Sequence, residues 1–268
     1  MKFSISNIAW NPKDDDQVVK LMKKYGISGV EIAPAKISDQ PGNISSEMIN
    51  AYSKKWQDRE VVLTSMQALL FGGPSANIFA SDQERGQIFE YLSKIIKIAG
   101  SLSTKKLVFG SPKNRLKGKL SKEEADQIAI QFFREIANMA SENQVQFCIE
   151  PNPSYYACDY INTSSEGIDL VKKVGHKGFG LHLDTAGMTL AGENVYETIC
   201  AAAGNFSHFH ISEKDLAPIG SGEVKHTEVS KALKEINYSD WLVIEMRQTE
   251  TSLKDIEYAF DFVSSIYK

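Results

Sequence analysis

Four ionisable residues stand at the ends of apolar runs, where their side chains could be brought together. Glu150 ends the run FCIE, Asp184 ends GLHLD, His210 ends FSHFH and Glu245 ends WLVIE. Each run is rich in the apolar residues of a buried strand, and Gly, Pro or polar residues typical of a loop follow it. We therefore expect all four side chains at the carboxyl ends of strands.

The spacing of these four residues suggests one shared site. They are separated by 34, 26 and 35 residues, which suits one strand, one helix and two loops each time. In an eight-fold βα barrel such strand ends converge on one face, where active sites lie. Three carboxylates and an imidazole gathered there would be costly to desolvate unless a cation neutralised them. The pattern predicts a divalent metal site.

The ligand types also narrow the choice of metal. Hard carboxylate oxygens with one imidazole favour Mn²⁺, Mg²⁺ or Co²⁺, with Mn²⁺ as the leading candidate and Zn²⁺ as a further binder. Taken singly, a carboxylate at a strand end often caps a helix, and a lone buried histidine is usually a hydrogen-bonded core residue. The four residues favour a metal site only as a regularly spaced set.

The bulk composition is that of one compact domain. The length of 268 residues and the apolar fraction of 42% suit a single α/β barrel over 1–268, and no linker or low-complexity run divides the chain. A net charge of −4 argues against a general nucleic-acid binder. No apolar run approaches the roughly 20 residues that span a bilayer.

The cysteines and the first residues predict a compartment. Cys148, Cys158 and Cys200 form no metal-type pair, and an odd number of cysteines suits a reducing environment. The segment MKFSISNIAW alternates like a strand and lacks the basic start and apolar core of a signal peptide. We therefore expect a cytoplasmic protein.

Strand-like and helix-like segments alternate along the chain. Strands are predicted near 3–9, 28–33, 61–67, 105–110, 145–150, 179–184, 206–211 and 241–246. Helices are predicted near 13–25, 45–59, 82–99, 121–142, 164–174, 193–203, 226–236 and 252–267. Strict alternation implies parallel strands with right-handed crossovers, and eight such units imply closure into a (β/α)8 TIM barrel.

Several of these segments resemble a known family. SNIAW at the first strand, GVEIAP at the second, SMQALLFG at the third and LVFGSPKNR at the fourth precede the four ligand strands, and His210-x-x-Glu213 is followed by GSGEV. Over nearly its whole length the chain resembles the xylose isomerase-like TIM barrels. The nearest branch is that of sugar and sugar-phosphate isomerases and epimerases, with the tagatose and psicose 3-epimerases; endonuclease IV is a distant relative.

The resemblance implies roles for individual residues. It implies that Glu150, Asp184, His210 and Glu245 bind one divalent metal ion. It also implies substrate contacts, which we assign to six residues: Trp10 as an apolar wall, Glu31 and Gln67 at the ends of strands 2 and 3, Arg115 as a fork for a phosphate or carboxylate, inward-facing His182, and Glu213. For Trp10, Arg115 and His182, packing or a solvated surface is the competing interpretation.

The expected chemistry is proton transfer next to a carbonyl, as in carbohydrate metabolism. A metal would hold the carbonyl and hydroxyl oxygens of a sugar and stabilise the developing enediolate, while two carboxylates act as base and acid. Glu150 and Glu245 are the candidates, because their strands lie on either side of Asp184 and His210. The sequence therefore predicts a metal-dependent isomerase or epimerase that acts on a small carbohydrate and has no nucleic-acid or membrane partner. It leaves undetermined whether the protein forms a homo-oligomer.

Three other functions compete with this prediction. A lyase like inosose dehydratase would use the same metal site, and a non-catalytic sugar-binding barrel could keep it. A nuclease like endonuclease IV is disfavoured, since this chain has no histidine before His176. Gly187, Leu216 and Tyr156 replace a His, an Arg and an acid of the tagatose and psicose epimerases, so the sugar itself stays open.

Overall fold

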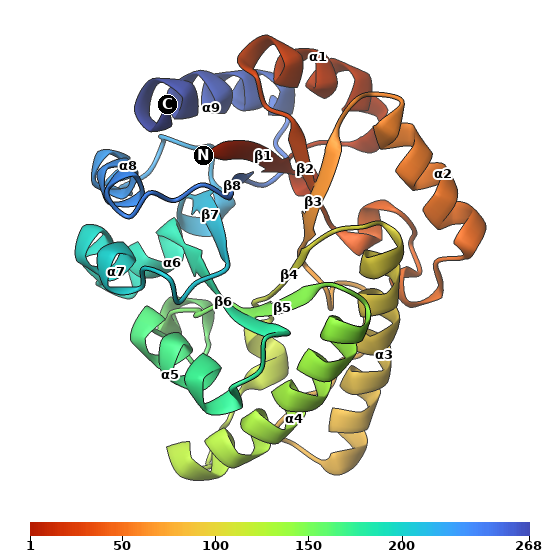
Figure 1. Cartoon of the computed structure of the whole chain (residues 1–268), viewed down its shortest axis with the longest axis vertical. Helices are drawn as coiled ribbons and strands as arrows, with labels where there is room; N and C mark the ends of the chain where they lie inside the picture. Colours follow the sequence, from red (N-terminus) through yellow and green to blue (C-terminus); the bar gives the residue numbers. More distant parts are fainter.

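Eight short apolar runs form the parallel strands of a closed barrel, in chain order from β1 to β8 (Figure 1). The computed structural model describes the whole chain, residues 1–268. The strands are β1 Lys2–Ser6, β2 Gly29–Ile32, β3 Val62–Met66, β4 Lys106–Phe109, β5 Gln146–Ile149, β6 Phe179–Asp184, β7 His208–Ser212 and β8 Trp241–Glu245. The pairing of β1 with β8 closes the barrel, which confirms the predicted (β/α)8 architecture.

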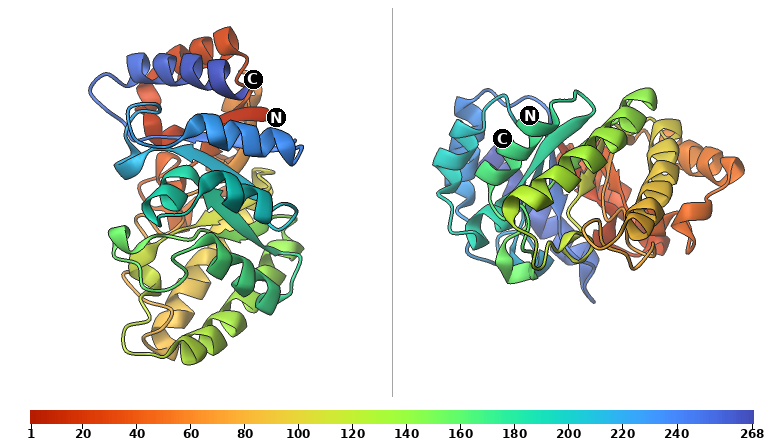
Figure 2. Two further views of the ribbon diagram at one scale, coloured as in Figure 1. Left: turned by 90° about the vertical axis from the view of Figure 1, so that its left-hand side faces the viewer. Right: turned by 90° about the horizontal axis from the view of Figure 1, so that it is seen from below.

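Helices surround the barrel on the outside, as Figures 1 and 2 show. They are α1 Asp15–Tyr25, α2 Ser46–Gln57, α3 Asp82–Ser101, α4 Lys122–Glu142, α5 Ser164–Val174, α6 Thr185–Leu190, α7 Val195–Ala201, α8 His226–Glu235 and α9 Ser252–Tyr267. Eight of the nine correspond to predicted helices. The exception is α6, a short helix that begins directly after β6. None of the helices combines the length and apolar character needed to cross a lipid bilayer.

Local signals set most helix ends. The side chains and backbone amides of Ser121 and Glu124 form a reciprocal capping box at the start of α4. Gly26 ends α1 with a left-handed φ of 66°, as a C-terminal glycine should. Gly100, by contrast, does not end α3, which continues to Ser101. A Cβ at Gly100 would lie 2.8 Å from the carbonyl oxygen of Asn143, so the close approach of the chain after α4 explains this glycine.

The apolar core lies between the strands and the helices. The apolar stripe of α4 packs against the barrel, where the ring of Phe133 stacks on Phe179 at 4.9 Å between centroids. Burying one such side chain contributes about 1.5–3 kcal/mol. The strand residues of opposite parity point into the barrel, and several are polar. Glu31 on β2 bonds to His208 on β7, strands that are not neighbours, so this contact crosses the interior.

Candidate metal centre

The four predicted ligands meet at the carboxyl ends of β5 to β8. Glu150 directly follows β5, Asp184 and Glu245 end β6 and β8, and His210 lies in β7 beside Asp184. Ligand atoms of Glu150, Asp184 and His210, together with one from His182, all lie within 4.8 Å of one another. Glu245 joins this group through His210, whose Nδ1 is 3.2 Å from Oε2 of Glu245. The fold therefore brings together the set that the spacing predicted.

The carboxylates of this group are crowded without a counter-charge. Burial, followed by repulsion from Asp184 and Glu245, raises the pKa of Glu150 to about 8. Burial, followed by repulsion from Glu245, raises the pKa of Asp184 to about 6. Both shifts show that negative charge is unfavourable here in the absence of a cation. A divalent ion would remove that penalty.

His210 is oriented by a buried carboxylate. Its Nε2 lies 3.0 Å from Oε2 of Glu31. The other oxygen of Glu31, Oε1, contacts Nε2 of His208 and accepts a hydrogen bond from the hydroxyl of Ser65. Burial alone would lower the pKa of His210, but Glu31 and Glu245 outweigh it and raise that pKa well above its ordinary value. Burial would likewise raise the pKa of Glu31, but His210 and His208 lower it well below the usual range.

The other ring nitrogen of His210 is the one available to a metal. Nδ1 is buried and makes no hydrogen bond, although it faces Glu245. In metal sites a histidine commonly donates its second N–H to a carboxylate, which sets the tautomer and leaves the first nitrogen to bind the ion. Three carboxylates and one unpartnered imidazole nitrogen form a donor set that fits a divalent cation.

A cleft opens onto this group at the carboxyl face of the barrel. It has a volume of about 620 Å³, and Glu150, Asp184 and Glu245 all line it. Gly110, after β4, provides the room that Glu150 needs. A Cβ at Gly110 would lie only 2.2 Å from Oε2 of Glu150, so a larger residue there would displace the carboxylate.

Asp184 also caps the start of α6, the short helix that follows β6. Its Oδ1 accepts a hydrogen bond of 2.6 Å from the amide of Gly187 and so caps α6, while Oδ2 accepts one from the hydroxyl of Ser212. Each carboxylate oxygen has a second lone pair, so capping and metal binding are compatible. The helix was missed because its six residues, TAGMTL, carry no helical period.

Four of the six expected substrate contacts are buried side chains: Trp10, Glu31, Gln67 and His182. The side chain of Trp10 is buried and donates to Asp15 at 2.7 Å, and Gln67 is buried and donates to Ser6 at 2.6 Å. Glu31 holds the two histidines described above. His182 is buried with no hydrogen-bond partner on either ring nitrogen. Burial, and then His210 and His208, lower the pKa of His182 well below its ordinary value, so its ring is neutral. None of these four lines the cleft.

The prediction that Arg115 binds an anionic group of the substrate is wrong for this structure. The guanidinium is completely buried, and its five N–H donors face protein acceptors. These acceptors are the carbonyl oxygens of Gly110, Glu150, Tyr160 and Ile161 and the side-chain oxygen of Asn152. Arg115 thus ties the loops after β4 and β5 together beneath Glu150. No donor is left for a ligand.

Glu213 borders the cleft, but its carboxylate is already engaged. Oε1 lies 3.0 Å from Nε2 of His226 and accepts from the amide of Gly220 at 3.2 Å, while Oε2 accepts from the amide of Val224 at 3.4 Å. His226 in turn contacts the buried hydroxyl of Tyr267 at 2.7 Å. Glu213 therefore holds the 220–224 loop in place.

Six polar residues that line the cleft were not predicted as ligand contacts: Ser111, Asn152, Tyr156, Ser212, Asp215 and Arg247. Tyr156 lies in the loop after β5, Asp215 in the loop after β7, and Arg247 two residues beyond Glu245. Tyr156 carried a signal, because it stands where the tagatose and psicose epimerases have an acid. The only signal of Asp215 and Arg247 is that each closely follows a ligand strand. Many loop residues share that property, so it could not single them out.

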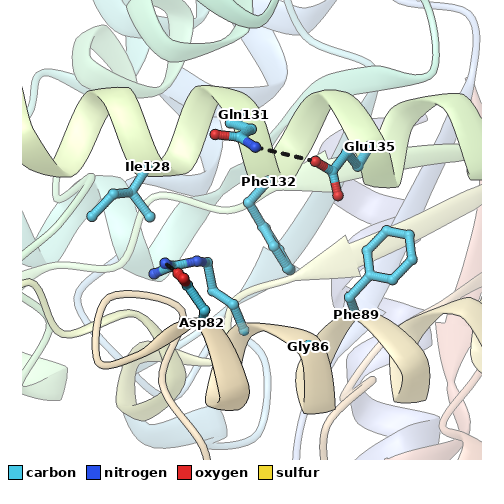
Figure 3. Close-up of a pocket in the computed structure, with 8 residues that line it drawn as sticks. Asp82, Gly86, Phe89, Ile128, Gln131, Phe132 and Glu135 are labelled. Atoms are coloured by element: carbon cyan, nitrogen blue, oxygen red, sulfur yellow. Dashed lines mark hydrogen bonds and ion pairs between the residues drawn. The ribbon is translucent and has the colours of Figure 1, made fainter.

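A second hollow lies on the outside of the molecule, between α3 and α4 (Figure 3). It measures about 460 Å³ and is lined by Phe89, Phe132 and polar helix residues such as Gln131 and Glu135. None of its lining residues comes from a strand end or from the groups that could hold a metal. The chemistry-bearing residues are at the barrel mouth.

Known proteins are similar to this chain in fold and, at low identity, in sequence. The model of the xylose isomerase-like TIM barrel family matches residues 19–265. A D-psicose 3-epimerase from Ruminiclostridium cellulolyticum is 31% identical over 117 residues, which span 44% of this chain and only 40% of that enzyme. A probable ketose 3-epimerase from Synechocystis is 25% identical over 252 residues, or 91% of this chain and 84% of that protein.

Solved structures agree in architecture. The crystal structure of D-psicose 3-epimerase with D-tagatose from Clostridium cellulolyticum H10 has a TM-score of 0.82 against this chain, at 23% identity and with 100% of both chains covered. That likeness establishes the fold. With the family match over 19–265 and the strand-end group at the barrel mouth, this chain belongs to the xylose isomerase-like TIM barrel family.

Proposed function

We propose that this protein is a divalent-metal-dependent epimerase of a keto sugar or sugar derivative. The observation that carries the proposal is the arrangement of two carboxylates, Glu150 and Glu245, which line one cleft on either side of Asp184 and His210. The similarity to ketose 3-epimerases supports the same reaction class. In this reaction a proton leaves the carbon next to a carbonyl and returns on the opposite face.

The metal ligands are proposed to be Glu150, Asp184, His210 and Glu245, with Mn²⁺ as the leading candidate. When bound, the ion would polarise the carbonyl and stabilise the negative charge that develops on proton removal. Glu31 orients His210 through Nε2, and Gly110 leaves Glu150 its place at the cleft. These contacts hold the ligand set before any substrate arrives.

Glu150 and Glu245 are proposed to remove the proton from the carbon next to the carbonyl and to return it. Epimerisation needs one group to remove it from one face and another to return it on the opposite face, and carboxylates from β5 and β8 reach the cleft from two sides. Burial, followed by Asp184 and Glu245, raises the pKa of Glu150 to about 8 in the metal-free protein. A bound cation would lower that pKa, so that Glu150 is ionised and can accept the proton.

We also propose that the protein works in a reducing, cytoplasmic compartment. Cys148, Cys158 and Cys200 are all unpaired. Cys148 and Cys158 are buried, and burial raises the pKa of both thiols. Unpaired thiols are usual where the cell keeps cysteine reduced.

The decisive experiment is proton exchange with solvent. The Mn²⁺-loaded protein is incubated with unphosphorylated and phosphorylated ketoses in D₂O, and deuterium incorporation and the product epimer are followed by NMR. Wild type should introduce deuterium next to the carbonyl, whereas Glu150→Gln and Glu245→Gln should each abolish exchange. Glu250→Gln, an exposed carboxylate in the loop after β8, is the matched control.

Two results would contradict the proposal. An active Glu150→Gln/Glu245→Gln double variant would remove the acid–base assignment. A product that has lost water would show a lyase instead of an epimerase. Bound metal with no exchange into any sugar would favour the sugar-binding barrel.

A further inference from the structure

The cleft is also lined by residues other than the predicted metal ligands. These residues include Tyr156, Asp215 and Arg247, one from each of the loops that follow β5, β7 and β8. The lining is rich in acceptors, because five carboxylates face the cleft: Glu150, Asp184, Glu213, Asp215 and Glu245. Arg247 is its one cation.

Tyr156 is held so that its hydroxyl proton stays free. Its Oη accepts a hydrogen bond of 3.1 Å from the amide of Asp215, and no protein acceptor takes its proton. The ring packs edge-on against Tyr155 with centroids 5.1 Å apart, and the Tyr155 hydroxyl donates to the Asp215 carboxylate at 3.1 Å. Burial, and the carboxylates of Asp184, Asp215 and Glu245, raise the pKa of Tyr156 to about 12. Its O–H is therefore a donor at neutral pH.

Arg247 is an unpaired guanidinium beside many carboxylates. Its side chain is exposed and makes no hydrogen bond or ion pair with the protein, while its backbone amide donates to the carbonyl of Leu216 at 2.8 Å. That bond ties the loop after β8 to the loop after β7. The five donors of the guanidinium remain open to the cleft.

The loop after β7 has an unusual backbone conformation. Asp215 and Leu216 adopt left-handed φ values of 57° and 55° in succession, although neither is glycine. Such conformations cost free energy and persist only where the surroundings enforce them, commonly at sites that clamp a ligand. Three hydrogen bonds enforce them here: the Tyr155 hydroxyl donates to the Asp215 carboxylate, the Asp215 amide donates to the Tyr156 hydroxyl, and the Arg247 amide donates to the Leu216 carbonyl.

We propose that Tyr156 and Arg247 form a donor wall that binds hydroxyl oxygens of the sugar, and that this wall selects a neutral sugar over a phosphorylated one. The inference rests on the proposed function. The hydroxyl oxygens of a sugar supply the hydrogen-bond acceptors that Tyr156 and Arg247 lack within the protein. A phosphate dianion is disfavoured because five carboxylates face one arginine, so the lining stays negative even with a divalent cation bound.

The test compares two variants with two matched controls. Tyr156→Phe removes only the hydroxyl, and Arg247→Met removes only the guanidinium. Tyr258→Phe and Lys254→Met are the controls, because Tyr258 and Lys254 are exposed residues of α9 that do not line the cleft. The probes are D-tagatose, D-fructose and their 6-phosphates. Binding to each Mn²⁺-loaded protein is measured by calorimetry, and kcat and KM are measured wherever a sugar turns over.

Wild type should bind a neutral sugar at least about tenfold more tightly than its 6-phosphate. Each cleft variant should weaken binding of the neutral sugar by about tenfold, the scale of one lost hydrogen bond. KM should rise more than kcat falls, and both controls should resemble wild type. Because the readout is binding, this test can fail while deuterium exchange still supports the proposed function.

Several outcomes would overturn the inference. One is unchanged affinity for neutral sugars in either cleft variant. Another is tighter binding of a 6-phosphate that is lost in Arg247→Met, which would make Arg247 a phosphate ligand. Absence of binding to all four sugars would also overturn it, whatever the metal content.

Discussion

Nε2 of His210 lies 3.0 Å from Oε2 of Glu31, and the two residues come from strands on opposite parts of the barrel, β7 and β2. Glu31 thereby dictates which nitrogen of His210 faces the carboxylate group of the cleft. Glu31→Gln should weaken Mn²⁺ binding by about 10- to 100-fold, the usual effect of removing such a partner. Calorimetric titration measures it, with exposed Glu60→Gln as the control. Equal affinity in Glu31→Gln and wild type would contradict the orienting role.

The imidazole of His210 should decide whether the protein retains metal. After Mn²⁺ loading and desalting, mass spectrometry should find about one ion per wild-type chain and almost none in His210→Ala, because one of the four proposed ligands is lost. His176→Ala is the control, since His176 lies outside the cluster and only accepts a bond from the amide of Gly178. A metal-free wild type that is fully folded would remove the basis of the proposed chemistry.

Metal affinity should rise with pH. In the metal-free protein burial and the neighbouring carboxylates raise the pKa of Glu150 to about 8, so at pH 6 a proton must leave before this carboxylate can bind an ion. Between pH 6 and 8 that competition fades, and the apparent affinity for Mn²⁺ should increase by at least about tenfold, with protons released on binding. Titrations in buffers of different ionisation enthalpy measure both quantities. A flat profile would show that Glu150 is already ionised at pH 6.

Gly110 should tolerate no side chain, because of Glu150. The Cβ of Gly110→Ala would lie 2.2 Å from Oε2 of Glu150, so the carboxylate must move away from the ligand group. We expect Mn²⁺ affinity to fall by at least about tenfold while the fold persists. Gly86→Ala is the control, because a Cβ there meets nothing within 4 Å on an exposed face of α3; it should stabilise the protein by about 0.5–1 kcal/mol. Normal metal binding in Gly110→Ala would show that Glu150 can relax.

Arg115 should matter for stability more than for ligand recognition. Arg115→Met leaves several buried carbonyl oxygens without a donor, each costing about 1–3 kcal/mol, so the free energy of unfolding should drop by at least about 3 kcal/mol. Urea unfolding measures this, with exposed Lys113→Met in the same loop as the control. A stable Arg115→Met protein with a raised KM for an anionic sugar would restore the role that the sequence suggested.

The sequence by itself determined the barrel and the strands that carry the candidate metal ligands. Strand and helix periods are local, so eight alternating units could be predicted, with Glu150, Asp184 and Glu245 at strand ends; His210 lies at the centre of β7 instead of at its end. The family motifs reinforced the same result. Only the short helix α6 was not predicted, because its six residues are too few to show a helical period.

Only the tertiary structure decided which side chains face the cleft. Arg115 looked like a ligand fork in the sequence, but carbonyls from two loops surround it. Glu31 bonds across the barrel to His210, 179 residues away, while Tyr156 and Arg247 reach one cleft from different loops. The direction of a loop side chain depends on partners that are distant in the chain, and no local pattern encodes them.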